Sequence, residues 1–195
     1  MKVLKFGGTS VGSPQRMQDV SKLITEDGEV KIVVLSAMSG TTNSLVEISG
    51  YLYKKNPEGA NTIINQLEQK YVEHINALYR TEEVKRKTLE FLHEEFDYLR
   101  SFTKVHFTSF EEKVILAQGE IISTNMVTNY LQECGIKAFL VNALDIIRTD
   151  KNAEPDMNYI KEKITKMLEN NAGYQIYVTQ GFICRNAYGE IDNLL

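Results

Sequence analysis

The chain has 195 residues, of which 43% are apolar and 25% charged, enough to bury the core of one domain. With 22 basic and 26 acidic residues, the net charge of −4 argues against a general nucleic-acid-binding protein. No apolar run reaches the length of a membrane-spanning helix and none resembles a signal peptide, so we expect a cytoplasmic protein without a membrane partner. The two cysteines, Cys134 and Cys184, lack metal-ligand spacing, and we expect reduced thiols, with Cys184 packed in the interior.

The N-terminal part of the chain alternates strand and helix patterns. A short apolar strand is expected at 2–6, and a continuous aliphatic strand at 30–35 that suits a sheet covered on both faces. A loop of small residues and a helical pattern follow each strand, and the second helix is expected at 43–55. This order predicts a parallel, doubly wound sheet.

The middle of the chain is predicted to be helical. After a break at 56–59, two amphipathic helices with charged outer faces indicate a helical hairpin. The histidines of these helices have no second ligand four residues away, which favours packing or surface roles over a metal site. A third helix is expected at 109–134, between a capping box of Ser109 and Glu112 and a stop at Gly135.

The alternation resumes in the last third of the chain. Strands are expected at 138–141 and 175–178, with a helix at 155–170 between them. The final segment, 182–195, contains a hairpin turn expected at 187–190.

Three segments rich in Gly, Ser and Thr each follow a predicted strand, at 5–10, 36–42 and 179–182. Ligands of open α/β sheets bind outside the carboxyl ends of the strands. The sequence therefore predicts a site built from these three segments.

Gly7 and Gly8 occupy the first of these segments. Because glycine has no side chain, its backbone N–H group can come close to an anion, and the N-terminus of the following helix adds positive potential. Lys5, just before them, is a point charge suited to bridging phosphates. The sequence matches neither the Walker pattern nor the dinucleotide-binding glycine pattern. A phosphate site and a tight strand-to-helix turn are therefore equally good interpretations.

Glu120 stands on an apolar stripe of the third helix, where an ionised carboxylate is costly unless it is paired. Lys5, at a strand end, is the expected partner. A structural salt bridge and a carboxylate that orients a substrate are the two interpretations.

Arg148 has two interpretations: it could hold a bound carboxylate or phosphate, or it could be a surface residue. We expect a surface role for Arg185. Thr42 suits either a ligand or a helix cap.

Five motifs occur in one order along the chain. They are Lys-Phe-Gly-Gly-Thr-Ser-Val at 5–11, Val-Val-Leu-Ser-Ala-Met-Ser-Gly-Thr-Thr-Asn at 33–43, Gln-Gly-Glu-Ile-Ile-Ser-Thr at 118–124, Arg-Thr-Asp at 148–150 and Val-Thr-Gln-Gly-Phe-Ile at 178–183. Together they resemble the aspartate kinases over essentially the whole chain. The last two motifs are more similar to the monofunctional, lysine-pathway type than to the fusion with homoserine dehydrogenase.

The resemblance implies an α/β fold, the three-layer α/β/α sandwich of the amino-acid-kinase (carbamate-kinase-like) family, with a mainly parallel sheet and an inserted helical hairpin. It also implies transfer of the ATP γ-phosphoryl group to the β-carboxylate of L-aspartate, which gives 4-phospho-L-aspartate on the route to lysine, threonine and methionine. Such chemistry needs positioning and charge neutralisation more than covalent help. Mg²⁺ held mainly by phosphates, and a homo-oligomer in the full-length enzyme, are implied as well.

The resemblance implies that the first motif binds ATP. Lys5, Phe6, Gly7 and Gly8 would contact the phosphates, and Lys5 would also stabilise charge as the phosphoryl group moves. No side chain is expected as a metal ligand.

For the amino-acid substrate, the resemblance assigns residues of the later motifs. Ser36 would help to line the reaction centre. Thr42 and Glu120 would bind aspartate, Glu120 through the α-ammonium group. Phe182 would close against the substrate.

The sequence departs from the family pattern at its end. In the family, the turn that matches 188–190 leads into an Arg-Gly-Gly-Ser-Asp segment that grips the substrate, and this chain ends before it. We therefore expect 1–195 to be the N-terminal lobe of the catalytic domain, without the nucleotide-binding C-terminal lobe and the regulatory ACT domains, and inactive by itself.

Two other readings of the residues stay open. One is another enzyme of the same fold, acting on glutamate, acetylglutamate, carbamate or UMP. The other is a non-catalytic module that binds aspartate without turning it over.

Overall fold

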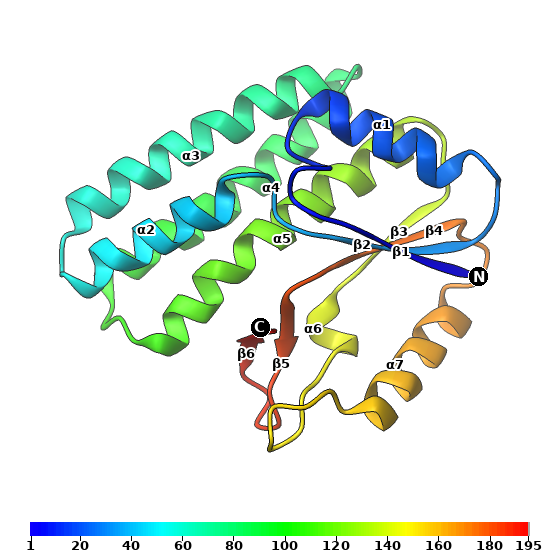
Figure 1. The fold of residues 1–195 in the computed structure, drawn as a ribbon. Coiled ribbons are helices and arrows are strands. Elements are labelled where there is room, and N and C mark those ends of the chain that lie inside the picture. The colour runs from blue at the N-terminus through cyan, green and yellow to red at the C-terminus, as the bar shows by residue number, and fades with distance from the viewer. Residues whose placement is uncertain (195) are drawn as a thin grey trace.

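The computed structural model describes residues 1–194, and a sheet of four parallel strands lies at its centre (Figure 1). The strands are β1 (Lys2–Phe6), β2 (Lys31–Leu35), β4 (Ile176–Gln180) and β3 (Ala138–Val141), in this spatial order. Their register pairs the last residues of β1, β2 and β4 with one another. The carboxyl ends of these strands therefore meet at one edge of the sheet.

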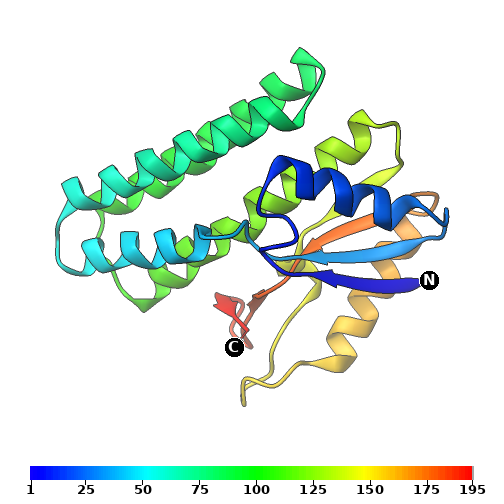
Figure 2. The same ribbon diagram turned by 45° about the horizontal axis from the view of Figure 1, so that its top comes forward.

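Helices cover both faces of the sheet, which makes three layers (Figures 1 and 2). On one face lie α1 (Pro14–Thr25) and α5 (Ser109–Glu133), whose apolar side chains join those of β2 in one buried cluster. On the other face, α7 (Met157–Asn170) packs against Tyr177 and Val141 of β4 and β3. The predicted α/β sandwich with a mainly parallel sheet is thus confirmed.

Four helices form a bundle to one side of the sheet (Figure 2). They are α2 (Thr41–Tyr53), α3 (Pro57–Leu78), α4 (Glu82–Ser101) and α5, and the short 3₁₀ helix η1 (Phe102–Lys104) follows α4. The α3–α4 pair is the predicted hairpin, and its buried face packs on α2 and α5. Since α5 contacts both the bundle and the sheet, one core runs through both.

The predicted capping box at the start of α5 is wrong by one residue. Thr108 is the N-cap, and its backbone N–H donates to the Glu111 carboxylate at 2.8 Å. The same Ser/Thr-x-x-Glu spacing occurs twice here, offset by one, and the helix uses the earlier copy. Glu112 instead accepts a hydrogen bond from the Tyr53 hydroxyl at 2.8 Å.

Other predicted boundaries differ by one or two residues. The strand expected at 30–35 begins at Lys31, and the helix expected at 43–55 begins at Thr41 and ends at Tyr53. The helix expected from residue 155 begins at Met157, because the Asp156 side chain caps it. A short helix, α6 (Ala143–Ile146), has no counterpart in the sequence prediction.

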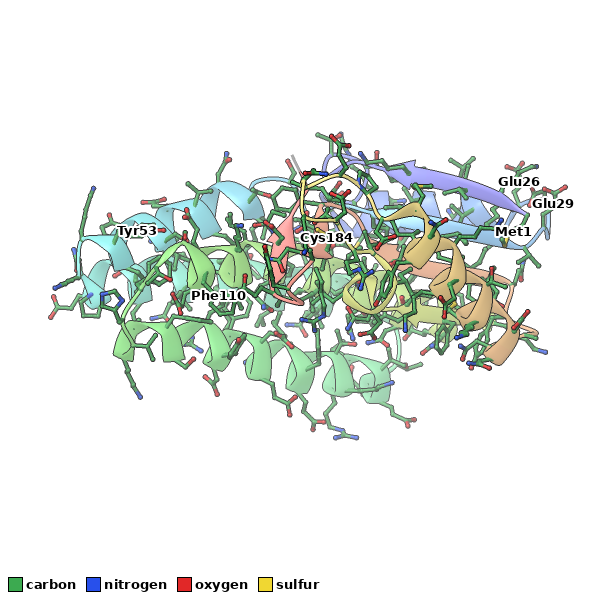
Figure 3. The ribbon with its side chains drawn as sticks, turned by 90° about the horizontal axis from the view of Figure 1, so that it is seen from below. Met1, Glu26, Glu29, Tyr53, Phe110 and Cys184 are labelled. Carbon is green, nitrogen blue, oxygen red and sulfur yellow. The ribbon has the colours of Figure 1, made fainter. Side chains whose placement is uncertain are left out.

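The C-terminal hairpin forms as predicted. Strands β5 (Ile183–Arg185) and β6 (Ile191–Asn193) pair antiparallel around a turn at Gly189, and residue 195 lies outside the described residues. Cys184 is buried in this hairpin, near the middle of the view in Figure 3. Arg185 is more than a surface residue, because its guanidinium donates to the carbonyls of Leu144 (3.1 Å) and Gly189 (2.7 Å) and ties the hairpin to α6.

Figure 3 shows the molecule along its length, with Met1, Glu26 and Glu29 gathered at one end and Tyr53 and Phe110 toward the other. Residues 1–194 contain no helix that combines the length and the apolar character needed to cross a membrane.

Candidate functional site

A pocket of about 630 Å³ opens at the edge of the sheet where the strands end. Its volume is in the usual range for sites that bind small molecules. The segments predicted from the sequence supply most of its lining, which consists of Lys5, Gly8, Thr9, Ser36, Ala37, Met38, Ser39, Gly40, Thr42, Asn43, Glu120, Phe182 and Leu194.

Lys5 and Glu120 both line this pocket, but they form no ion pair among the described residues, so the predicted pairing is wrong. Side chains alternate along a strand. Leu4 and Phe6 of β1 point toward the core shared with α5, and Lys5 therefore leaves the opposite face. The Lys5 side chain is exposed, which leaves its ammonium group available to a ligand.

Glu120 is a buried carboxylate with one oxygen unused. Its side chain is 4% exposed, and Oε1 accepts the backbone N–H of Ala37 at 3.1 Å. Oε2 has no hydrogen-bond partner among residues 1–194. Loss of solvent raises the pKa of Glu120 to about 7. A cationic donor in the pocket would satisfy Oε2 and stabilise the ionised form.

Two glycines let the walls of the pocket come together. A Cβ added at Gly8 would lie 2.6 Å from the carbonyl oxygen of Ala37, and one added at Gly119 would lie 2.7 Å from the Cβ of Ala37. These contacts support the tight-turn interpretation of Gly8. Gly7 differs, because an added Cβ would meet nothing within 4 Å.

Backbone N–H groups offer the pocket a place for an anion. The N-cap of α2 is Gly40, which has no side chain to bind the first N–H groups of the helix. The N–H groups of Thr42 and Asn43, and of Gly8 and Thr9 across the pocket, donate to no acceptor in the described part of the chain. Together with Lys5 and the positive end of the α2 dipole, they fit a phosphate or a carboxylate.

The loop between β2 and α2 is held from two helices. The Ser123 hydroxyl, one turn beyond Glu120 in α5, donates to the Ser36 carbonyl at 2.8 Å. The Lys70 ammonium of α3 donates to the Ser39 carbonyl at 2.8 Å. Lys70 lies far from every motif in the sequence, so its contribution had no signal there.

Phe182 has an unusual backbone conformation. Its φ of +65° lies in the left-handed region, which a bulky residue adopts only when its surroundings enforce it. Its carbonyl accepts the N–H of Leu194 at 2.6 Å, and its half-buried side chain lines the pocket.

The fold brings six of the eight predicted site residues to one pocket: Lys5, Gly8, Ser36, Thr42, Glu120 and Phe182. The other two lie beside it. The Phe6 side chain packs against the core and lines a groove next to α1, and Gly7 links Phe6 to the pocket.

Arg148 lies outside the pocket lining. It pairs with Asp156 at 2.5 Å and stacks 4.0 Å from the ring centre of Tyr159. Leu194 lines the pocket without any signal in the sequence, because only the hairpin brings it there.

No group of three His, Cys, Asp or Glu side chains suited to a metal ion occurs within residues 1–194.

Known aspartokinases are similar to this chain over most of its length. The lysine-sensitive aspartokinase 3 of Escherichia coli is 28% identical over 184 residues, which cover 93% of this chain and 40% of that protein. An aspartokinase of Chlamydia muridarum is also 28% identical, over 96% of this chain and 40% of its own length.

Solved structures show the same fold. The crystal structure of Escherichia coli aspartokinase III in complex with aspartate and ADP superposes with a TM-score of 0.84 at 27% identity, over all of this chain and 43% of that one. An aspartate kinase of Clostridium acetobutylicum, at 18% identity and a TM-score of 0.77, shares the fold.

The chain spans about two fifths of the length of each of these two aspartokinases. The family model described as "Amino acid kinase family" matches residues 1–194, nearly the whole chain. On this match, and on the fold that carries it, the chain belongs to the amino acid kinase family.

Proposed function

We propose that this pocket is the amino-acid and phosphate side of an ATP-dependent aspartate kinase, which transfers the γ-phosphoryl group of ATP to the β-carboxylate of L-aspartate. One observation carries the proposal: an exposed lysine and a buried carboxylate with a free oxygen line the same pocket, in a family member whose similar proteins are aspartokinases. A zwitterionic substrate next to a phosphate chain needs both kinds of group.

Glu120 would bind the α-ammonium group of aspartate through Oε2. The Ala37 N–H holds Oε1 and so fixes the direction in which Oε2 points. Thr42 and the start of α2 would bind a carboxylate of the substrate, since their N–H groups are free. Phe182 would close the pocket over the bound amino acid.

Lys5 would neutralise negative charge on the phosphates, including the γ-phosphoryl group as it passes from ATP to the β-carboxylate. The open space at Gly7 and the free N–H groups of Gly8 and Thr9 would let phosphate oxygens come close to the backbone. Ser36 would line the point at which the two substrates meet. ATP supplies the phosphoryl group, and Mg²⁺, held mainly by the phosphates, would neutralise part of their charge.

The proposal for the whole protein reaches beyond this chain. The relatives are more than twice as long as the region they share with it. We infer that residues 1–195 form the N-terminal lobe of the catalytic domain, and that turnover needs the nucleotide-binding and regulatory parts of such a protein. A homo-oligomer and a cytoplasmic location belong to the same proposal, as does the lysine-pathway type.

Calorimetric titration of the purified chain with L-aspartate tests the site itself. We expect binding of L-aspartate, and none of L-glutamate or N-acetylglutamate at the same concentrations. Preference for either control would reassign the substrate within the family, and binding of none would contradict the proposal.

Release of ADP with Mg-ATP and L-aspartate tests the activity. We expect it from the product of the reading frame continued past residue 195, and not from the chain alone. Turnover by the chain alone would contradict the proposed division of the catalytic domain. Aspartate binding without turnover in either protein would favour the non-catalytic binding module.

A further inference from the structure

Gln180, the last residue of β4, joins three elements behind the pocket. Its side chain is buried, with 6% of its surface exposed. Oε1 accepts the backbone N–H of Ala143, the first residue of α6, at 2.7 Å. Nε2 donates to the hydroxyl of Thr124 in α5 at 2.8 Å. Gln180 does not itself line the pocket.

These contacts fix the orientation of the amide. A backbone N–H can only donate, so the atom that faces Ala143 must be the oxygen and the atom that faces Thr124 must be the nitrogen. Thr124 has one hydroxyl proton, which it donates to the Glu120 carbonyl at 2.7 Å. The Thr124 oxygen is therefore an acceptor for Gln180, and the hydrogen bonds run in one direction from Gln180 to the Glu120 turn.

The same residue begins the strained turn at the pocket. Gln180 pairs with Leu35 in the sheet, and the next N–H, that of Gly181, donates to the Leu35 carbonyl at 2.8 Å. Phe182, two residues on, has the left-handed backbone described above. A strained conformation persists only when its surroundings hold it in place. Gln180 anchors the strand end from which this turn starts.

We propose that Gln180 is a positioning residue, which sets the Phe182 wall of the pocket at a fixed distance from the Glu120 turn by bridging β4, α5 and α6. Gln180 touches neither substrate in this proposal. It acts through Glu120 and Phe182, and its effect on ligand binding rests on the proposed function.

The test uses a substitution that keeps the shape and changes one donor. In Gln180→Glu, an ionised carboxylate still accepts from Ala143 but presents a second acceptor to Thr124. Thr124 can then bond to residue 180 only by turning its hydroxyl proton away from the Glu120 carbonyl, so one of the two hydrogen bonds is lost. Protonation of this buried carboxyl group restores a donor. We expect L-aspartate to bind about tenfold more weakly than to the wild type near pH 8. Glu120 takes up a proton over the same pH range and weakens binding in both proteins, so the two are compared by the ratio of their dissociation constants, which should fall toward one near pH 5.

Gln132→Glu is the control for the chemical change itself, made at an exposed glutamine. Gln132 also lies on α5, and its Nε2 donates to the carbonyl of Ala138 at 3.0 Å. Ala138 begins β3, at the opposite end of the sheet from the pocket. The same chemical change there should leave aspartate binding unaltered. Thr124→Val is the second variant: it removes the acceptor of Gln180, and it should weaken binding without any recovery at low pH.

Urea unfolding of each variant precedes the titrations. If Gln180→Glu is folded and binds aspartate like the wild type near pH 8, or if the control weakens binding equally, the proposal is overturned. If Gln180→Glu does not fold, Thr124→Val takes its place: a folded Thr124→Val that binds aspartate like the wild type overturns the proposal.

Amide hydrogen exchange separates this proposal from the proposed function. Even if the wild type binds no aspartate, which contradicts the function, Gln180 can be judged on the empty protein. Faster exchange at Gly181 and Ile183 in Gln180→Glu, but not in Gln132→Glu, supports the positioning role. Unchanged exchange at both amides overturns it.

Discussion

The unpaired oxygen of Glu120 links the pocket to the stability of the fold. The pKa of Glu120 is about 7 in the folded protein, against an ordinary value of 4.5, because burial disfavours the charge. Between these two values the folded state binds more protons than the unfolded state. The free energy of unfolding therefore falls as pH rises from 4.5 to about 7, by up to about 3 kcal/mol.

Glu120→Gln should remove this dependence. The amide oxygen can still accept from Ala37, and no charge is buried at any pH. We expect the variant to be more stable than the wild type near pH 8, by about 1–3 kcal/mol, and nearly equal to it below pH 4.5. Urea unfolding at both pH values measures the difference. A variant that is less stable near pH 8 would show that Oε2 is already satisfied.

The same substitution should abolish binding of L-aspartate, since a neutral amide cannot balance the ammonium group. For the wild type, affinity should rise with pH up to about 8, as Glu120 loses its proton. Titration calorimetry follows both effects, and affinity that is independent of pH would remove Glu120 from the ammonium site.

Gly8 and Gly7 are adjacent residues with opposite surroundings. An added Cβ at Gly8 would press on the Ala37 carbonyl, whereas one at Gly7 would meet open space. We expect Gly8→Ala to lower the free energy of unfolding by about 1–3 kcal/mol, and Gly7→Ala to change it by less than about 1 kcal/mol. Chemical unfolding of the pair compares them directly. Equal losses would contradict a packing role specific to Gly8.

Among the elements, the start of α5 offers a matched pair of capping variants. Thr108 is the N-cap and Ser109 is the first residue of the helix. Thr108→Ala should cost about 1 kcal/mol of stability, and Ser109→Ala should cost close to nothing. If only the Ser109 variant lowered the thermal midpoint, Ser109 and not Thr108 would be the N-cap, as the sequence pattern predicts.

The elements themselves could largely be predicted from the sequence, because each obeys a local rule. The aliphatic run of β2 and the amphipathic faces of α3 and α4 each indicate the secondary structure that forms. Ends were harder to predict, since two capping patterns overlap at 108–112 and only packing chooses between them. The short α6 was missed because its four residues are too few to show a helical period, although Asn142 caps it locally.

The site could be predicted only in part, for a similar reason. Strand ends and small residues pointed to the right segments, and Lys5 and Glu120 do line one pocket. Their pairing was wrong because it depends on which face of β1 carries Lys5, which follows from the sheet and not from the local pattern. The contributions of Lys70 and Gln180 depend on contacts between distant segments.

At the scale of the whole molecule, α5 joins the helical bundle to the sheet. Buried side chains of the bundle and of the strands belong to one continuous core. We expect a single cooperative unfolding transition. Far-UV circular dichroism, dominated by the helices, and tyrosine fluorescence, with Tyr71 in the bundle and Tyr177 in the sheet, should give the same midpoint. Two separate midpoints would mean that the bundle and the sheet unfold independently.

The pocket draws its walls from Lys5, Ser36, Glu120 and Phe182, which are spread over most of the chain. On the ribosome these residues emerge one after another, and the pocket is incomplete until Phe182 has been made and β4 has been inserted between β2 and β3. Contacts between residues so distant in sequence form late, because the entropy cost of closing a long loop must be met before such contacts can stabilise the fold. A nascent chain would therefore gain affinity for its ligand in one late step, and the ligand would favour only chains in which the sheet is complete.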